Sequence, residues 1–119
     1  MSMFTTILAT IVALEHLFIF YLETIATQSE KTGKTFNMSQ EELSRKSVST
    51  LLKNQGIYNG LLALFLLYGI ITGNLEITTI FVLFVIGAAG YGAATSSPSI
   101  LLKQGGPAIL ALLSILLFR

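Results

Sequence analysis

Residues 13–23, ALEHLFIFYLE, place two glutamates and the only histidine of the chain inside an apolar run. The run extends from Met3 to Ala26, about 24 residues and roughly 36 Å as a helix, which is long enough to cross a bilayer with some tilt. Ionisable groups are costly in hydrocarbon and usually mark a pathway, a site or a buried pair. The stretch therefore predicts a membrane protein, and it locates a site before it indicates a function.

The composition of the whole chain is that of a membrane-embedded unit. Its 119 residues are 53% hydrophobic and 11% charged, with a mean hydropathy of +0.77, which is too apolar for a typical soluble domain and too short for several domains. The net charge of +1 argues against a nucleic-acid partner, because a phosphate-binding surface needs clustered Lys and Arg. The absence of cysteine excludes disulfides, iron–sulfur ligation and thiol nucleophiles. We expect no cofactor, and catalysis would have to use His, Glu, Lys, Tyr or hydroxyl groups.

Four apolar segments predict an all-α membrane protein, an up-down-up-down bundle of four transmembrane helices. They form a single integral membrane domain over residues 1–119, and they cover residues 3–26, 40–72, 75–95 and 99–118. The hydrophilic stretch 28–39 is expected to be a cytoplasmic loop. A capping box at Ser39-Gln40-Glu41-Glu42 predicts that a helix starts there and continues into the second span. The turn before the fourth span is expected at Ser96-Ser97-Pro98-Ser99.

The basic residues predict the orientation of the bundle. Five of them surround the first connection: Lys31, Lys34, Arg45, Lys46 and Lys53. Lys103 lies beside the third connection, and the second connection, residues 73–76, has no basic residue. The positive-inside rule then places the first and third connections in the cytoplasm and both termini outside. We expect a multi-pass protein of the cell inner (plasma) membrane, with the lipid bilayer as its partner. The first span lacks basic residues ahead of it and a cleavage site after it, so it is not expected to be a removable signal peptide.

Seven polar side chains from the four spans are the candidate ligand-binding residues. They are Glu15, His16, Glu23, Gln55, Asn59, Tyr91 and Gln104. In the predicted topology they lie in the cytoplasmic half or near mid-membrane, whereas the outer half of the bundle is an apolar plug. Helical spacing puts His16 and Glu23 on one stripe of the first span, and Gln55 and Asn59 on one stripe of the second. The pattern predicts a polar pocket that faces the cytoplasm.

The ionisable candidates each have a structural alternative. His16 with Glu23 is either a general base with its partner or a charge-assisted pair that fixes helix packing. Glu15 either shuttles protons or binds a cation or amine, or it is a neutral acid hydrogen-bonded across to Asn59 or Tyr91. One histidine and two glutamates on one helix do not make the compact cluster that zinc or iron needs, so no metal site is expected. Glu15 and His16 are the candidate catalytic residues, and no catalytic role is assigned.

The remaining candidates also have two interpretations. The amides of Gln55, Asn59 and Gln104 either line the pocket or hold helices together, and Tyr91 either packs its ring on small neighbours or turns its hydroxyl to the pocket. Lys53 is either an interfacial lysine or a partner of Glu23. Small residues spaced four apart on the second and third spans indicate close helix packing, either inside the bundle or between the protomers of a homo-oligomer.

Four blocks of sequence, one in each span, resemble a known family. They are VALEHL with YLE, NQGIYNG, GYGAAT and QGGPA, at residues 12–17, 21–23, 54–60, 90–95 and 104–108. The chain is similar to the domain-of-unknown-function family 1304 of small bacterial integral membrane proteins. The resemblance implies the architecture and the choice of site residues, and the family name carries no activity.

Three functions are compatible with these patterns. The favoured one is a protein that binds or carries a small polar or amphipathic ligand in the predicted pocket. The first alternative is a membrane-embedded acid/base enzyme of the isomerase or epimerase type, with Glu15 or His16 acting on a lipid-soluble substrate. The second is a small proton-coupled transporter. No phosphate loop, nucleophile elbow or paired-histidine motif occurs in the sequence.

Overall fold

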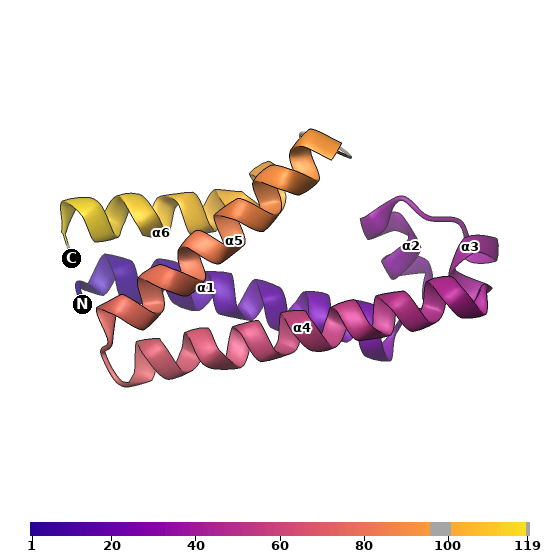
Figure 1. Ribbon diagram of the computed structural model, residues 1–119, viewed down its shortest axis with the longest axis horizontal. Coiled ribbons are helices and arrows are strands. Elements are labelled where there is room, and N and C mark those ends of the chain that lie inside the picture. The colour runs from indigo at the N-terminus through magenta and orange to yellow at the C-terminus, as the bar shows by residue number, and fades with distance from the viewer. Residues whose placement is uncertain (96–100, 119) are drawn as a thin grey trace. The chain divides into compact units, whose positions relative to one another are not determined.

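The computed structural model describes residues 1–95 and 101–118, and every element in these two ranges is a helix. Figure 1 shows the arrangement of the chain. The elements are α1 (Met3–Phe20), the π-helical segment η1 (Tyr21–Ile25), α2 (Glu30–Phe36), α3 (Gln40–Ser44), α4 (Lys46–Ile71), α5 (Leu75–Thr95), the π-helical segment η2 (Leu101–Gly105) and α6 (Gly106–Leu117). The predicted all-helical class is confirmed. The predicted turn at residues 96–99 lies outside the described residues.

Three of the described helices are long and apolar enough to cross a membrane. They cover Met3–Ile25, Lys46–Ile71 and Leu75–Thr95. A fourth apolar helix, Lys103–Leu117, is shorter than these three. The number of membrane spans therefore stays a prediction, and the structure supports the coarser statement that these apolar helices could span a bilayer.

The helices divide into two compact units, and the division passes through α1 and α4. Unit 1 consists of Met1–Glu15 and the chain from Ala63 onward, and unit 2 consists of His16–Leu62.

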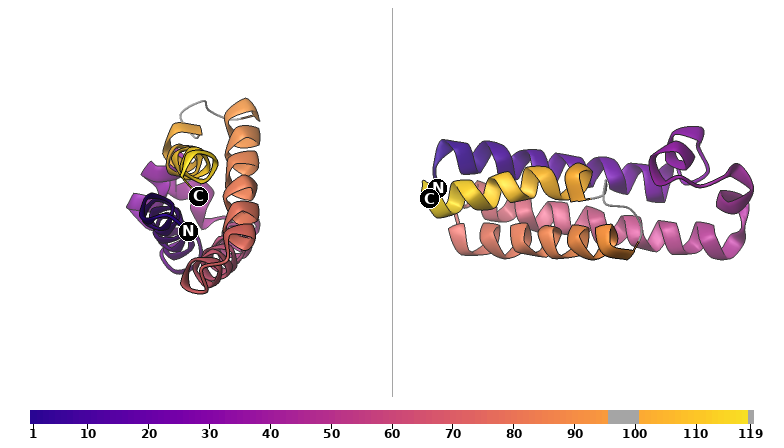
Figure 2. Two further views of the ribbon diagram at one scale, coloured as in Figure 1. Left: turned by 90° about the vertical axis from the view of Figure 1, so that its left-hand side faces the viewer. Right: turned by 90° about the horizontal axis from the view of Figure 1, so that it is seen from above.

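In unit 1 the start of α1 lies beside the end of α6 (Figure 2). The ring centroids of Phe4 and Phe118 are 5.4 Å apart. The hydroxyl oxygens of Thr5 and Ser114 are 2.6 Å apart, and both residues are buried. This hydroxyl pair satisfies two polar groups that would be costly to bury alone. It lies in the part of the bundle that the sequence predicts to be an apolar plug, with Ser114 as one of its polar exceptions.

Helices α4 and α5 form an antiparallel hairpin in unit 1. Gly73, with a φ of 64°, makes the turn, and the Asn74 side chain accepts a hydrogen bond of 3.0 Å from the backbone N–H of Ile77 to cap α5. The rings of Phe65 and Phe81 then pack with their centroids 6.0 Å apart. The hairpin turn and the cap together fix the direction in which α5 returns.

In unit 2 the hydrophilic connection contains a helix that the sequence analysis does not predict. The loop expected at residues 28–39 includes α2, seven residues long. Ser29 caps its first turn by accepting a hydrogen bond of 3.2 Å from the backbone N–H of Thr32. Asn37 ends it in the left-handed conformation, and Met38 N donates to the carbonyl of Gly33. The expectation of a loop is wrong over α2 because both of its ends are capped.

The predicted capping box is confirmed at the start of α3. Ser39 Oγ accepts a hydrogen bond of 3.1 Å from Glu42 N, and the Glu42 carboxylate accepts one of 3.0 Å from Ser39 N. The helix does not continue into the second span, because Arg45 is extended (ψ 131°) and separates α3 from α4. The predicted continuous helix over residues 40–72 is therefore interrupted one residue before Lys46.

Helix α2 is tied to the end of the first long helix in unit 2. The fully buried Thr32 hydroxyl lies 3.0 Å from the carbonyl oxygen of Leu22 and 2.7 Å from that of Ala26. The Thr32 hydroxyl therefore lies against carbonyls at the end of the first long helix, and the Ala26 carbonyl also accepts a backbone hydrogen bond of 3.0 Å from Ser29 N. The ammonium of Lys31 lies 5.0 Å from the ring centroid of Phe18, in a cation–π contact.

Close packing in unit 2 depends on two glycines of α4. A Cβ on Gly56 would collide with the Thr24 hydroxyl and lie 3.0 Å from Glu23 Cβ, and a Cβ on Gly60 would lie 3.0 Å from the Phe20 ring. The Thr24 hydroxyl donates a hydrogen bond of 2.9 Å to the carbonyl of Lys53. The spacing of small residues on α4 therefore serves contact inside the chain, as one of the two interpretations predicts.

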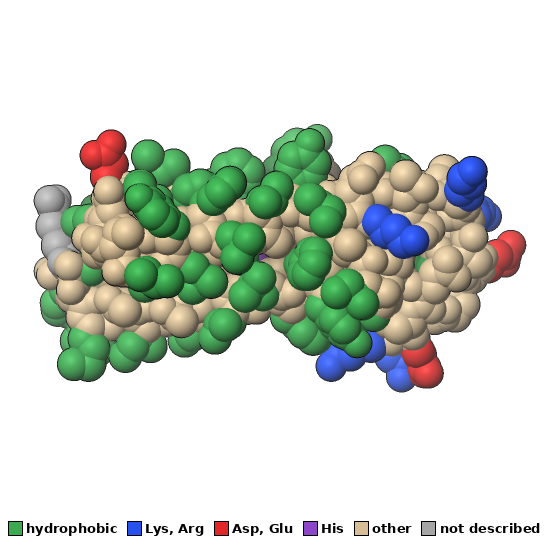
Figure 3. All heavy atoms as spheres, turned by 90° about the horizontal axis from the view of Figure 1, so that it is seen from below, with side chains coloured by type: hydrophobic (Ala, Val, Ile, Leu, Met, Phe, Trp, Pro, Cys, Tyr) green, Lys and Arg blue, Asp and Glu red, His purple; other side chains and the backbone are tan. Residues whose placement is uncertain are grey.

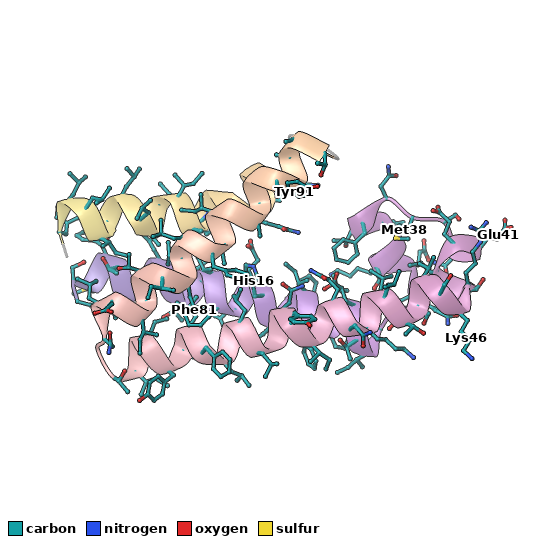
Figure 4. The ribbon with its side chains drawn as sticks, in the orientation of Figure 1. His16, Met38, Glu41, Lys46, Phe81 and Tyr91 are labelled. Carbon is teal, nitrogen blue, oxygen red and sulfur yellow. The ribbon has the colours of Figure 1, made fainter. Side chains whose placement is uncertain are left out.

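The exposed surface is divided by residue type. On the face drawn in Figure 3, apolar side chains cover much of the long helices, and Lys and Arg side chains gather where α2, α3 and the start of α4 lie. Figure 4 labels Met38, Glu41 and Lys46 in this region of unit 2.

The capping box predicts a pH-dependent helix end. The backbone and side-chain hydrogen bonds of Ser39 lower the pKa of Glu42 below its ordinary value of 4.5. Because the folded pKa is the lower one, the cap stabilises α3 above pH 4.5 and this stabilisation is lost as the pH falls through the folded pKa. An NMR titration of the Glu42 carboxyl carbon should show this low pKa. Ser39→Ala should raise it towards the ordinary value and Thr35→Ala should leave it unchanged; equal titrations in all three proteins would contradict the cap.

The glycine packing predicts a matched pair of alanine variants. Gly56→Ala should lower the free energy of unfolding by about 1–3 kcal/mol, because the new methyl displaces the Thr24 hydroxyl from Lys53. Gly87→Ala on α5 is the control, since a Cβ there meets nothing within 4 Å. Unfolding in detergent, followed by circular dichroism, measures both. Equal stability of the two variants would show that the first helix does not approach α4 at Gly56.

Candidate functional site

A buried carboxyl and an amide from different helices meet in unit 2. Asn59 Nδ2, on α4, donates a hydrogen bond of 2.7 Å to Glu23 Oε1, on η1. Glu23 is 5% exposed and Asn59 is half-buried. Two of the seven predicted site residues are therefore in direct contact, although the sequence analysis did not pair them with each other.

The π-helical turn of η1 positions the Glu23 side chain. The backbone N–H of Ala26 bonds to the carbonyl of Tyr21 at 2.8 Å, a hydrogen bond that spans five residues instead of four. The adjacent residues Leu22 and Glu23 are both buried in this wider turn. The Thr27 hydroxyl donates at 2.7 Å to the backbone carbonyl of Glu23 and satisfies it. Single π-helical turns within α-helices are frequent at functional sites.

The Glu23 carboxyl has a neutral partner and no cationic one among the described residues. The ion pair in these ranges is Lys34 with Glu30, 3.1 Å apart on the surface of α2. Lys53 lies close to the site only through its backbone carbonyl, which accepts from Thr24. The alternative in which the Lys53 ammonium pairs with Glu23 is therefore wrong.

The other candidates in unit 2 have different surroundings. His16 is buried, 5% exposed, and Figure 4 shows it on α1. Gln55, one turn before Asn59 on α4, is exposed. The structure therefore buries Glu23 and partly buries its partner Asn59, whereas Gln55 is exposed.

Three candidates belong to unit 1. Glu15 is half-buried, and its Oε1 is buried without a hydrogen-bond partner in the part of the chain that the structure describes. Tyr91 is 74% exposed on α5 (Figure 4), and Gln104 is half-buried in η2. Within the described ranges no hydrogen bond joins any two of these side chains. A pocket formed by all seven residues stays a prediction.

A hollow that the sequence analysis does not predict lies on the α2–α3 connection of unit 2. It has a volume of about 560 Å³ and is open to the surface. Six of its eight lining residues are polar or charged, and the eight are Glu30, Gly33, Lys34, Asn37, Met38, Ser39, Gln40 and Glu42. The left-handed Asn37 shapes it by turning the chain between the two short helices. The hydrophilic stretch 28–39 is the only sequence signal for it, and that stretch alone indicates a solvated connection.

The described residues contain no group of three or more His, Cys, Asp or Glu side chains that could hold a metal ion. The chemistry available at Glu23 and Asn59 is therefore hydrogen bonding by an amide and by a carboxyl that can carry a proton or a negative charge.

Comparison with known proteins gives a family without an assigned activity. No solved structure matches the chain. The uncharacterized protein YpaA of Lactococcus lactis subsp. lactis (strain IL1403) is 53% identical over 116 residues, which cover 96% of this chain and 98% of the relative. The family described as "Protein of unknown function (DUF1304)" matches residues 10–116. The chain belongs to this family of unknown function.

Proposed function

We propose that this chain is a four-span membrane protein that binds a small polar or amphipathic ligand at the Glu23–Asn59 pair. The observation that supports the proposal is the hydrogen bond of 2.7 Å between a buried carboxyl and an amide on another apolar helix. In this proposal, the protein lies in the cell inner membrane with both termini outside and with α2 and α3 in the cytoplasm. The surrounding bilayer is its lipid partner.

The cost of burying a carboxyl supports a role beyond packing. A buried polar pair can often be replaced by well-packed apolar side chains with little loss of stability. The amide of Asn59 satisfies only one oxygen of Glu23. A carboxyl that keeps hydrogen-bonding capacity inside an apolar helix is therefore best explained by a ligand that uses it.

The access to the pair supports binding from the cytoplasmic side or the lipid side. Asn59 is half-buried, so part of its side chain reaches the surface of α4. The cytoplasm-facing pocket predicted from the sequence would bring Glu15, His16, Gln55, Tyr91 and Gln104 towards the same ligand. In this proposal the Glu23–Asn59 pair is the part of that pocket already joined by a direct contact.

A second candidate function is a membrane-embedded acid/base enzyme of the isomerase or epimerase type. It is favoured by Glu15, whose buried Oε1 has no hydrogen-bond partner among the described residues. A carboxyl oxygen in this state is available to accept a proton from a lipid-soluble substrate. Glu15 would then be the general base.

The binding function predicts that a ligand is retained during purification. Protein isolated from membranes in a mild detergent should carry a small molecule or lipid that organic extraction and mass spectrometry detect. Glu23→Met and Asn59→Leu should lose most of it, because each removes one half of the hydrogen-bonded pair. Glu41→Gln on α3 is the matched control, since Glu41 is exposed and does not line the hollow on the α2–α3 connection.

Circular dichroism should show that all the variants are folded. Identical extracts from all four proteins, or a wild-type protein that carries nothing, would contradict binding at this pair. If Glu15→Gln retains the molecule but stops its conversion to an isomer, the enzyme is the better description.

A further inference from the structure

We infer that the ligand of the Glu23–Asn59 pair is an ammonium ion with N–H donors, carried on an apolar chain. This inference rests on the proposed binding function and adds the chemical class of the ligand. It is drawn from the donors and acceptors that the pair uses, from the charges around it, and from the side chains that flank it.

The pair offers more hydrogen-bond acceptors than donors to a ligand. Asn59 uses one N–H of its Nδ2 to bond Glu23, so its amide oxygen and one N–H are left for other contacts. The second oxygen of Glu23 receives no hydrogen bond from any described residue. Two acceptor oxygens on one pair fit a ligand that donates hydrogen bonds, and they repel a carboxylate or a phosphate.

The Glu23 carboxyl has no positively charged Lys or Arg partner among the described residues, so a ligand could supply the cation. No Lys or Arg in the described ranges lies within 4.0 Å of the Glu23 carboxyl. The nearby basic side chains have other positions: Lys34 pairs with Glu30, and Lys31 lies over the Phe18 ring. A buried carboxylate without a counter-charge is strongly unfavourable, so the group must take up either a proton or a cation. A ligand ammonium supplies both the charge and the N–H donors.

The elements that carry the pair also present apolar side chains to their surroundings. Exposed apolar residues are close in sequence to Glu23 on η1 and to Asn59 on α4. They are Tyr21, Ile25, Ile57, Tyr58 and Leu61, each at least 44% exposed. We therefore expect a ligand that reaches the pair through these surroundings to carry an alkyl chain. The inferred ligand is therefore an amphipathic primary or secondary amine.

The test compares four probes that share a twelve-carbon chain and differ in the head group: dodecylammonium, dodecyltrimethylammonium, dodecanol and dodecanoate. Each is titrated below its micellar concentration into the full-length protein in dodecyl maltoside, and binding is measured by calorimetry. Dodecylammonium should bind saturably. The other three should bind at least about tenfold more weakly, since each lacks the N–H donors, the positive charge or both. This comparison uses the wild-type protein, so it does not depend on the folding of a variant.

Two variants locate the binding. Glu23→Gln keeps the shape of the side chain but removes its charge, and it should weaken dodecylammonium binding at least about tenfold. The exposed control Glu41→Gln should bind as the wild type does. Undiminished binding by folded Glu23→Gln, or tighter binding of dodecanoate or dodecyltrimethylammonium, would overturn the inference.

One outcome separates this inference from the function on which it rests. If dodecanol binds as tightly as dodecylammonium and its binding is lost in Asn59→Leu, the pair is a binding site but not one for a cation. The binding function would then stand, and the ammonium class would be wrong. Absence of saturable binding by every probe would also overturn the ammonium class, whereas retention of a natural molecule would still test the binding function by itself.

Discussion

The hydrogen bond from Asn59 to the buried carboxyl of Glu23 is the interaction on which the rest of unit 2 depends. It requires the end of the first long helix and α4 to approach closely, and Gly56 and Gly60 make that approach sterically allowed. It also requires the wider turn of η1, which buries Glu23 beside Leu22. The buried Glu23 carboxyl thus requires both the π-helical backbone of η1 and the small residues of α4 that face it.

The hydrophilic connection that follows η1 also helps to position Glu23, because its helix α2 contacts the end of η1. The hydroxyl of Thr32 on α2 lies within hydrogen-bond distance of the carbonyls of Leu22 and Ala26 at the end of the first long helix. Because this hydroxyl is fully buried, α2 is held against η1 and is more than a solvated linker. The connection therefore contributes to the position of Glu23, and a polar stretch outside the apolar helices helps to shape the proposed site within them.

Much of the fold was predictable from the sequence because helix length and capping are local properties. The apolar runs predicted the long helices, and the Ser39–Glu42 pattern predicted the cap. The break at Arg45, the helix α2 and the π-helical turn were not predicted. Helix α2 depends in part on a contact outside the helix, that of Thr32 with the carbonyl of Leu22. The predicted topology put Glu23 and Asn59 in the same half of the bundle, but it could not pair them, since the pairing depends on how η1 turns.

The most direct test of the central claim is the exchange of the Asn59 side-chain amide in protein labelled with ¹⁵N asparagine. The chain has four asparagines, and the other three, Asn37, Asn54 and Asn74, are exposed and serve as internal references. The account predicts that the Asn59 amide protons exchange with deuterium more slowly than the other three and show a nuclear Overhauser contact to the Glu23 side chain. Exchange of Asn59 as fast as that of Asn54, with no contact to Glu23, would contradict the account.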